Sequence, residues 1–93
     1  MAKLVEFWGR ECPHCAVMAP LVERLKKEEK VQIEQLEVWH DQANQAEMRK
    51  HEKTLNNACG GFMGTPVFLN TETNDALCGE QDYETLKKWA LKK

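Results

Sequence analysis

The chain has 93 residues, of which 42% are hydrophobic, which is enough for one compact core but not for two. Its 13 basic and 15 acidic side chains nearly cancel to a formal net charge of −2, which argues against nucleic acid or an acidic membrane as partner. No apolar run approaches the roughly 18 residues that cross a bilayer, and the first residues lack the order of a signal peptide. We therefore expect a single domain over residues 1–93, located in the cytoplasm.

The first half of the chain alternates strand-like and helix-like patterns. Residues 3–8 form a short apolar run with one acid, Glu6, which is typical of a strand buried on both faces. Over residues 13–29, apolar side chains recur at helical spacing, which indicates an amphipathic helix. Residues 31–39 alternate between apolar and polar side chains, which predicts a second strand.

The second half adds two helices and a hairpin. Residues 42–58 are polar and helix-favouring, with a thin apolar stripe. Residues 67–69 form a brief apolar strand, and a polar turn leads to a further strand over residues 76–78. Asp82 can cap a last helix that runs to the end of the chain. The order β-α-β-α-β-β-α predicts an α/β fold with a four-stranded mixed sheet and helices on both faces.

Cys12 and Cys15 form a C-x-x-C motif at the start of the first predicted helix. Side chains three residues apart on a helix lie about 5–6 Å from each other, close enough to form a disulfide after modest adjustment. Free N–H groups and the helix dipole favour a thiolate at Cys12, which is the expected nucleophile. Cys15, one turn inside and less exposed, is the expected resolving thiol. Pro13 fits the first turn, where its missing N–H costs nothing.

His14 lies between the two cysteines. Its positive charge or its N–H would favour a thiolate nearby and make the disulfide more oxidising. The alternative is a solvent-facing spacer without influence on the sulfur.

Zinc and haem sites also use C-x-x-C motifs. Haem attachment needs His directly after the second cysteine, where this chain has Ala16. A zinc ribbon needs a second close cysteine pair, whereas Cys59 and Cys78 lie far apart in the sequence. The spacing thus favours redox chemistry without a metal, with a zinc site as the alternative.

The residues around the motif resemble the thioredoxin superfamily, and the similarity extends over nearly the whole chain. Residues 6–15, Glu-Phe-Trp-Gly-Arg-Glu-Cys-Pro-His-Cys, resemble the family's strand, aromatic pair and active-site turn, with Glu6 where thioredoxins carry a buried Asp. Pro20 falls where the family has a helix-kinking proline. Residues 64–69, Gly-Thr-Pro-Val-Phe-Leu, resemble its cis-proline loop and the strand that follows.

The resemblance implies a minimal thioredoxin fold and thiol–disulfide oxidoreductase activity. It implies that Pro66 is cis and faces the sulfurs, and that the backbone of Thr65 pairs with an extended substrate segment beside Cys12. Glu6 would shuttle a proton to or from Cys15. The alternative places Glu6 at a sheet margin, with its carboxylate in water.

The resemblance also implies how the protein is supplied with electrons. We expect no bound cofactor or metal, and we expect a thioredoxin reductase or glutathione to donate electrons to the redox-active disulfide. The expected partners are disulfide-containing proteins, and the expected state is a monomer with a role in electron transport and redox homeostasis. A non-catalytic module that uses the same fold to bind a partner is the alternative.

Three features depart from standard thioredoxins. Residue 11 is Glu where thioredoxins have Trp, and Pro13 and His14 stand where they have Gly-Pro. The family's additional N-terminal strand and helix are not in the sequence. The short length resembles glutaredoxins instead, and residues 78–82 loosely resemble the loop that holds glutathione in those proteins.

The remaining cysteines and aromatic residues have simpler interpretations. Cys59 and Cys78 are expected to be small buried hydrophobes, with a second disulfide or a regulatory thiol pair as the alternative. Trp8 is a candidate substrate contact, although it also fits the core. Large aromatic side chains are expected in the core at Trp8, Trp39, Trp89, Phe62 and Phe68.

Overall fold

The computed structural model describes residues 3–92, so residues 1, 2 and 93 of the expected domain lie outside the described residues. Helices and strands alternate along most of the described chain, and none of its helices is long and apolar enough to cross a membrane. In chain order the elements are β1 (Leu4–Trp8), α1 (Pro13–Glu29), β2 (Ile33–Glu37), α2 (Gln42–Arg49), α3 (Glu52–Ala58), β3 (Val67–Asn70), β4 (Asp75–Cys78) and α4 (Tyr83–Leu91).

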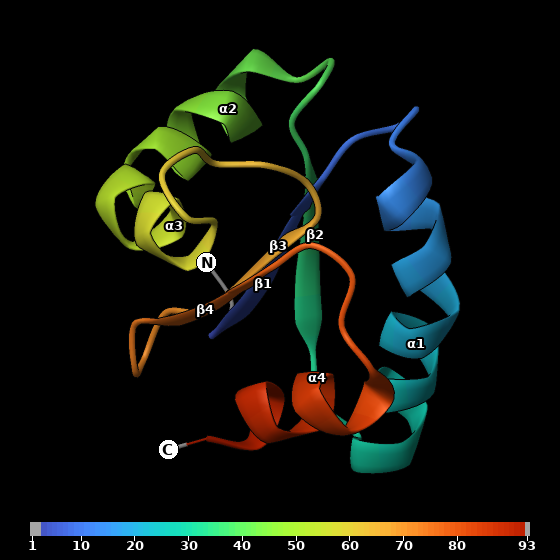
Figure 1. The fold of residues 1–93 in the computed structure, drawn as a ribbon. Helices are drawn as coiled ribbons and strands as arrows, with labels where there is room; N and C mark the ends of the chain where they lie inside the picture. Colours follow the sequence, from blue (N-terminus) through green and yellow to red (C-terminus); the bar gives the residue numbers. More distant parts are fainter. Residues whose placement is uncertain (1–2, 93) are drawn as a thin grey trace.

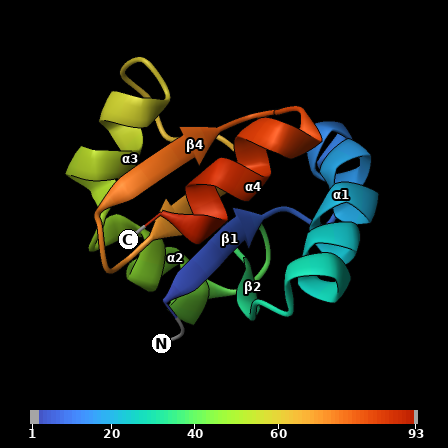
Figure 2. The same cartoon turned by 90° about the horizontal axis from the view of Figure 1, so that it is seen from below.

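The strands form one mixed sheet in the order β2-β1-β3-β4 (Figure 1). β1 runs parallel to β2 and antiparallel to β3, and β3 and β4 form the antiparallel hairpin. Helices α1 and α4 cover one face of the sheet, and α2 and α3 cover the other (Figures 1 and 2). The predicted α/β class, the mixed sheet and the two helical layers are confirmed.

Alternation along β1 distributes its side chains between the two layers. Val5 and Phe7 pack beneath α2 and α3, whereas Leu4 packs beneath α1 and α4. Glu6 points to the same side as Leu4 because the two are two residues apart in a strand. Only 2% of Glu6 is exposed, so the alternative of a carboxylate in water at the sheet margin is wrong.

One predicted helix is wrong in its length. Residues 42–58 form two helices, α2 and α3, which are separated at Lys50 and His51. The N–H of His51 bonds to the carbonyl of Met48, three residues back, and this tightens the last turn of α2. His51 then leaves helical geometry, with φ −109° and ψ 16°. Neither Gly nor Pro marks this break, so the helix-favouring composition conceals it.

A second disulfide joins Cys59, directly after α3, to Cys78 at the end of β4. Their Cα atoms are 5.1 Å apart. The expectation that both are simple buried hydrophobes is therefore wrong, and the alternative of a second disulfide is the one the structure contains. Because β4 is the edge strand next to β3, this bond ties α3 to the edge of the sheet.

Removal of this disulfide is expected to destabilise the protein markedly. The bond spans 19 residues of sequence, and a loop of this size corresponds to about 3 kcal/mol of unfolding free energy. We expect Cys59→Ala/Cys78→Ala to lose this amount in urea unfolding under oxidising conditions. As a matched control, Cys12→Ala/Cys15→Ala opens a bond that spans 3 residues, and should lose roughly half as much. Equal losses in the two double variants would contradict the loop argument.

Candidate active site

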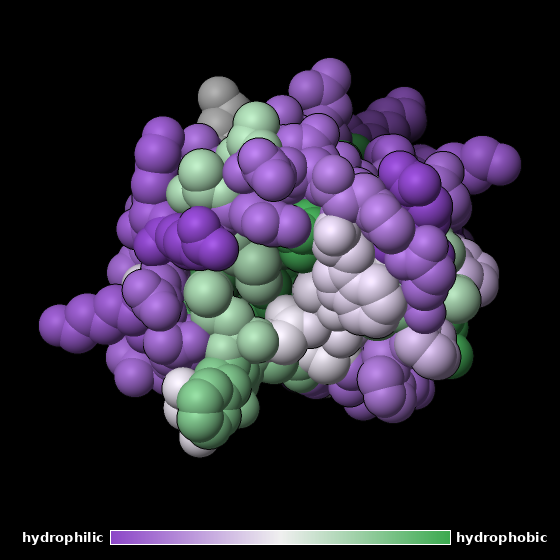
Figure 3. Space-filling model, turned by 90° about the horizontal axis from the view of Figure 1, so that it is seen from above, coloured by the Kyte–Doolittle hydropathy of each residue, from purple (hydrophilic) through white to green (hydrophobic). Residues whose placement is uncertain are grey.

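The end of the molecule where α1 begins has a partly apolar surface. Viewed from above, near-neutral and apolar side chains are exposed between hydrophilic ones (Figure 3). The exposed aromatic residues include Phe62, which is 88% exposed, and Trp39, which is 47% exposed, so the prediction that both lie in the core is wrong. Phe68 and Trp89 do lie in the core, where their rings meet edge to face at 5.6 Å.

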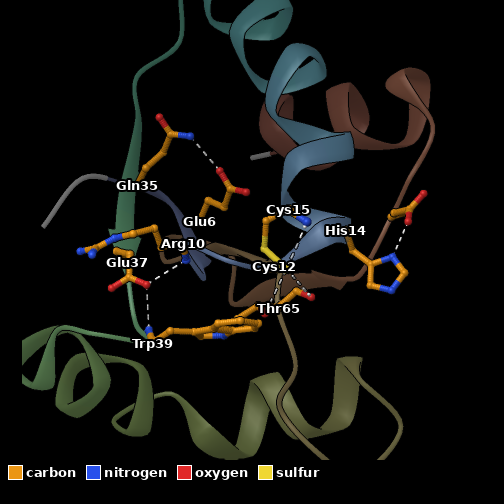
Figure 4. The surroundings of a disulfide bond; sticks show 10 residues. Glu6, Arg10, Cys12, His14, Cys15, Gln35, Glu37, Trp39 and Thr65 are labelled. Atoms are coloured by element: carbon orange, nitrogen blue, oxygen red, sulfur yellow. Dashed lines mark hydrogen bonds and ion pairs between the residues drawn. A yellow bond between two sulfur atoms is a disulfide. The ribbon is translucent and has the colours of Figure 1, made fainter.

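Cys12 and Cys15 form a disulfide at the N-terminus of α1, with their Cα atoms 5.2 Å apart (Figure 4). Cys12 is the N-cap residue and Pro13 occupies the first turn, as predicted. The helix continues through Pro20, whose missing N–H leaves one carbonyl without its ladder bond. Each cysteine is only 5% exposed, so the predicted difference in exposure between them is wrong.

Hydrogen-bond donors distinguish the two sulfurs instead. The backbone N–H of Cys15 points at Cys12 Sγ from 3.1 Å, and the hydroxyl of Thr65 points at it from 3.4 Å. The first is an N-cap bond, one of the free donors that a helix start provides. Both donors would bond to a thiolate on Cys12 after reduction, and hydrogen bonds to an anion favour the ionised form.

Thr65 and Pro66 lie directly beside this sulfur. The carbonyl oxygen of Thr65 is 3.5 Å from Cys12 Sγ, and the peptide bond to Pro66 is cis, as the family resemblance implies. Pro66 is buried, and its carbonyl accepts a 2.8 Å hydrogen bond from the N–H of Gly79, beyond the end of β4. The structure thus brings together two segments that are 53 residues apart in sequence.

Glu6 lies on the floor of this region and is held by one neutral partner. The side-chain amide of Gln35, its neighbour on β2, donates a 3.0 Å hydrogen bond to Glu6 Oε1. Burial raises the pKa of Glu6 above its ordinary value of 4.5, while the Gln35 bond and the charge of Lys26 act in the opposite direction. Gln35 went unrecognised in the sequence because nothing there specifies which residue of β2 pairs with Glu6.

A cavity of about 350 Å³ connects Glu6 with the disulfide. Both cysteines and the Glu6–Gln35 pair border it, so the carboxylate and the sulfurs share one space that is large enough for water. Trp8, the candidate substrate contact, is half-buried on the same wall. The lining residues are Glu6, Trp8, Gly9, Arg10, Cys12, Cys15, Ala16, Ala19 and Gln35.

His14 points away from the sulfur. Its ring Nδ1 pairs with the carboxylate of Glu80, in the loop between β4 and α4 (Figure 4). This nitrogen therefore pairs with Glu80 and does not donate a hydrogen bond to Cys12. Because both side chains are exposed, water screens the charge of the pair. The sequence placed His14 within the motif but did not indicate its partner, which is 66 residues away.

Glu37 and Trp39 lie beside the active-site turn, outside the lining of the cavity (Figure 4). The carboxylate of Glu37 accepts hydrogen bonds from three backbone N–H groups, and these lower its pKa against the effect of burial. One of the three donors is Arg10, in the active-site turn, and another is Trp39, so Glu37 joins the two loops (Figure 4). The indole of Trp39 then lies over Gly9, where a Cβ atom would overlap the ring.

A side chain at Gly9 is therefore expected to displace Trp39. Since Trp39 is partly exposed and can swing outward, we expect Gly9→Ala to cost about 1 kcal/mol, at the low end for overpacking. The indole N–H resonance of Trp39 should shift toward that of a solvent-exposed indole. Gly64→Ala is the control, because a Cβ there would meet nothing within 4 Å. An unchanged Trp39 resonance in Gly9→Ala would show that the ring does not cover this position.

The comparisons with known proteins agree with this geometry. The thioredoxin family model matches residues 1–92, and the chain belongs to the thioredoxin family. No curated protein matches the sequence significantly. Similar solved structures include a glutaredoxin from Archaeoglobus fulgidus, at 21% identity over 96% of this chain and 86% of that chain, with a TM-score of 0.64.

A second similar structure is a mutant of a thioredoxin-like protein, at 21% identity over 96% of this chain and 95% of that chain, with a TM-score of 0.58. At this identity the two structures show a shared fold. The family assignment and the Cys12–Cys15 disulfide support a redox role.

Proposed function

We propose that the protein is a thiol–disulfide oxidoreductase, with Cys12 as nucleophile and Cys15 as resolving thiol. The observation that carries the proposal is the convergence of donors on Cys12 Sγ. The N–H of Cys15 and the hydroxyl of Thr65 both point at this sulfur, which lies at the start of a helix. Such a site favours a thiolate, the form that attacks disulfides.

The reaction proceeds in two exchanges. The thiolate of Cys12 attacks one sulfur of the substrate disulfide, whose S–S bond breaks, and the other substrate sulfur leaves as a thiolate that takes up a proton. The thiol of Cys15 then loses its proton and attacks Cys12 Sγ in the mixed disulfide. The second substrate thiol leaves, and the Cys12–Cys15 disulfide forms, so two electrons pass to the substrate.

Glu6 is the proposed acceptor of the Cys15 proton. Both groups border the same cavity, where water can link them. Burial raises the pKa of Glu6 and so brings it nearer to neutral pH, which suits a group that must take up and release protons. Gln35 is the proposed positioning residue that holds the carboxylate toward the cavity.

The substrate is proposed to lie along Thr65 and Pro66. The main chain of Thr65 already lies against Cys12, so an extended segment paired with it would bring its own sulfur to the nucleophile. Trp8 is proposed as a further contact from the cavity side. The substrate class is then a disulfide in an extended or loop segment of a protein.

We further propose that residues 1–93 form one domain that acts as a monomer in the cytoplasm, without a bound metal or cofactor. A thioredoxin reductase or glutathione would restore its dithiol form. Turnover of a protein disulfide should be followed with each donor system separately. Turnover with either supports the enzyme, and absence of turnover with both overturns it. Zinc analysis of the protein, together with a mass increase of two hydrogens on reduction of each disulfide, separates the enzyme from a zinc-binding module.

His14 is expected to tune the reduction potential weakly. A positive charge near the sulfur stabilises the thiolate, so His14→Pro should lower the potential and yield a stronger reductant. Because His14 is exposed and paired with Glu80, we expect less than a tenfold change in the exchange constant with glutathione, which is less than about 30 mV. A constant or higher potential in His14→Pro would identify His14 as a spacer.

A further inference from the structure

The Cys59–Cys78 disulfide lies between two segments that both reach the catalytic cysteines. Residues 60–64 run from Cys59 to Thr65, whose hydroxyl and carbonyl contact Cys12 Sγ. Residues 79–81 run from Cys78 to α1, where Glu80 pairs with His14 and Gln81 contacts Met18. The bond therefore joins the two arms that close around the active site on the side of β3.

The arm that follows Cys78 makes three contacts with the site. The N–H of Gly79 bonds to the carbonyl of Pro66 at 2.8 Å, and Glu80 pairs with His14. The N–H of Gln81 points at Met18 Sδ, on α1, from 3.3 Å. The segment that follows Cys78 is thus in direct contact with the proline loop and with the C-x-x-C helix.

The arm that follows Cys59 is held mainly at its two ends. Gly60 and Gly61 have φ angles of 78° and 131°, in the left-handed region that favours glycine. A Cβ at Gly60, Gly61 or Gly64 would meet no atom within 4 Å, and Phe62 is 88% exposed. Met63 packs against the core beneath α3, and the N–H of Gly61 bonds to the carbonyl of Asn56 at 2.7 Å. The disulfide at Cys59 adds a covalent constraint to these two contacts on the segment that leads to Thr65.

Cys59 and Cys78 lie at the edge of the core and not within it. Both are only partly buried, at the margin of the core beneath α3. A disulfide sealed in the core would be shielded from attack by a thiol, whereas this bond joins two residues that are only partly buried.

We propose that Cys59–Cys78 is a second redox-active site, which exchanges with low-molecular-weight thiols of the glutathione class and controls the reactivity of Cys12. One thiolate attacks a sulfur of the pair, breaks the S–S bond and forms a mixed disulfide. A second thiol then attacks the reagent's sulfur, releases the low-molecular-weight disulfide and leaves Cys59 and Cys78 as two thiols. Release of the arm loosens Thr65, so Cys12 loses one hydrogen-bond donor and reacts more slowly.

The exchange itself is tested in the variant Cys12→Ser/Cys15→Ser, which retains only the second pair. The protein is equilibrated with mixtures of reduced and oxidised glutathione and then alkylated. Mass spectrometry then counts the alkylated thiols. We expect both thiols to appear together in one two-electron step while circular dichroism retains the folded signal. A pair that stays oxidised until the protein unfolds would overturn the proposal and leave a purely structural bond.

The control of Cys12 rests on the proposed function, and its test uses alkylation rather than turnover. We compare the rate at which iodoacetamide modifies Cys12 in Cys15→Ser and in Cys15→Ser/Cys59→Ala/Cys78→Ala. The expected result is at least a threefold slower reaction without the second pair. Cys15→Ser/Leu86→Ala, with its cavity in the opposite core layer, controls for loss of stability.

Equal rates in the first two variants, or the same slowing in the Leu86→Ala control, would overturn the coupling between the pairs. Failure of the proposed function is distinguishable from either result. In that case Cys12 would still be alkylated at a rate that depends on the second pair, but the protein would not turn over a disulfide substrate.

Discussion

Cys12→Ser is expected to reduce disulfide turnover to the background rate, whereas Cys15→Ser is expected to capture substrates as stable mixed disulfides. A serine hydroxyl is not ionised near neutral pH and does not attack disulfides, so the first exchange cannot begin without Cys12. Without Cys15 the first exchange still occurs, but no neighbouring thiol releases the product.

The two variants are compared by incubation with a peptide that contains one disulfide, followed by non-reducing electrophoresis and mass analysis. Val17→Ser, at an exposed position of α1 that does not border the cavity, is the control and should turn over normally. Since both cysteines are equally buried as a disulfide, the outcome depends on the donors around Cys12. Comparable trapping by Cys12→Ser and Cys15→Ser would contradict the assigned roles.

Glu6→Gln is expected to slow the release step about a hundredfold, the lower range for loss of a general base. The amide keeps the size of the side chain and can still bond to Gln35, but it cannot accept the Cys15 proton. Single-turnover kinetics should show normal formation of the mixed disulfide and slow resolution. Glu84→Gln, at an exposed position in α4, is the matched control. An unchanged rate of resolution would show that Glu6 does not act as the base.

The same variant is expected to change how stability depends on pH. The pKa of Glu6 is raised in the folded protein, so the folded state holds this proton more tightly than the unfolded state does. The stabilisation is present below the ordinary value of 4.5 and is lost as pH rises through the higher folded value. The free energy of unfolding in urea should therefore be measured at several pH values. As pH rises through this range, it should fall less in Glu6→Gln than in the parent protein.

Local patterns predict much of this fold because the spacing of apolar side chains along each helix or strand depends only on residues that are close in sequence. The alternation in β1 and the helical spacing of α1 determine which faces are buried, and α1 spans the predicted residues 13–29. The C-x-x-C motif and residues 65 and 66 belong to the family's two signature segments, and the structure places them side by side. Periodicity, however, does not reveal a change in backbone direction. The pattern of residues 42–58 therefore predicts one helix where the structure has two.

Contacts between distant segments were the harder part to predict. Trp39 and Phe62 are hydrophobic enough for the core, but the loops that carry them end at the active-site surface. The pairing of Cys59 with Cys78 depends on α3 lying against the edge strand, which no local pattern expresses. Likewise, the partner of His14 lies 66 residues away. In each case the deciding information is the tertiary arrangement.

The central claim is that Cys12 and Cys15 pass two electrons to a substrate disulfide, and it is tested most directly by stoichiometry. Cys59→Ala/Cys78→Ala, in which only the catalytic pair can donate electrons, is reduced, freed of reductant and mixed with a peptide that contains one disulfide. We predict that each peptide disulfide reduced is matched by one protein molecule that loses two hydrogens in mass and forms the Cys12–Cys15 bond. A protein that keeps both thiols while the peptide stays oxidised would contradict the claim.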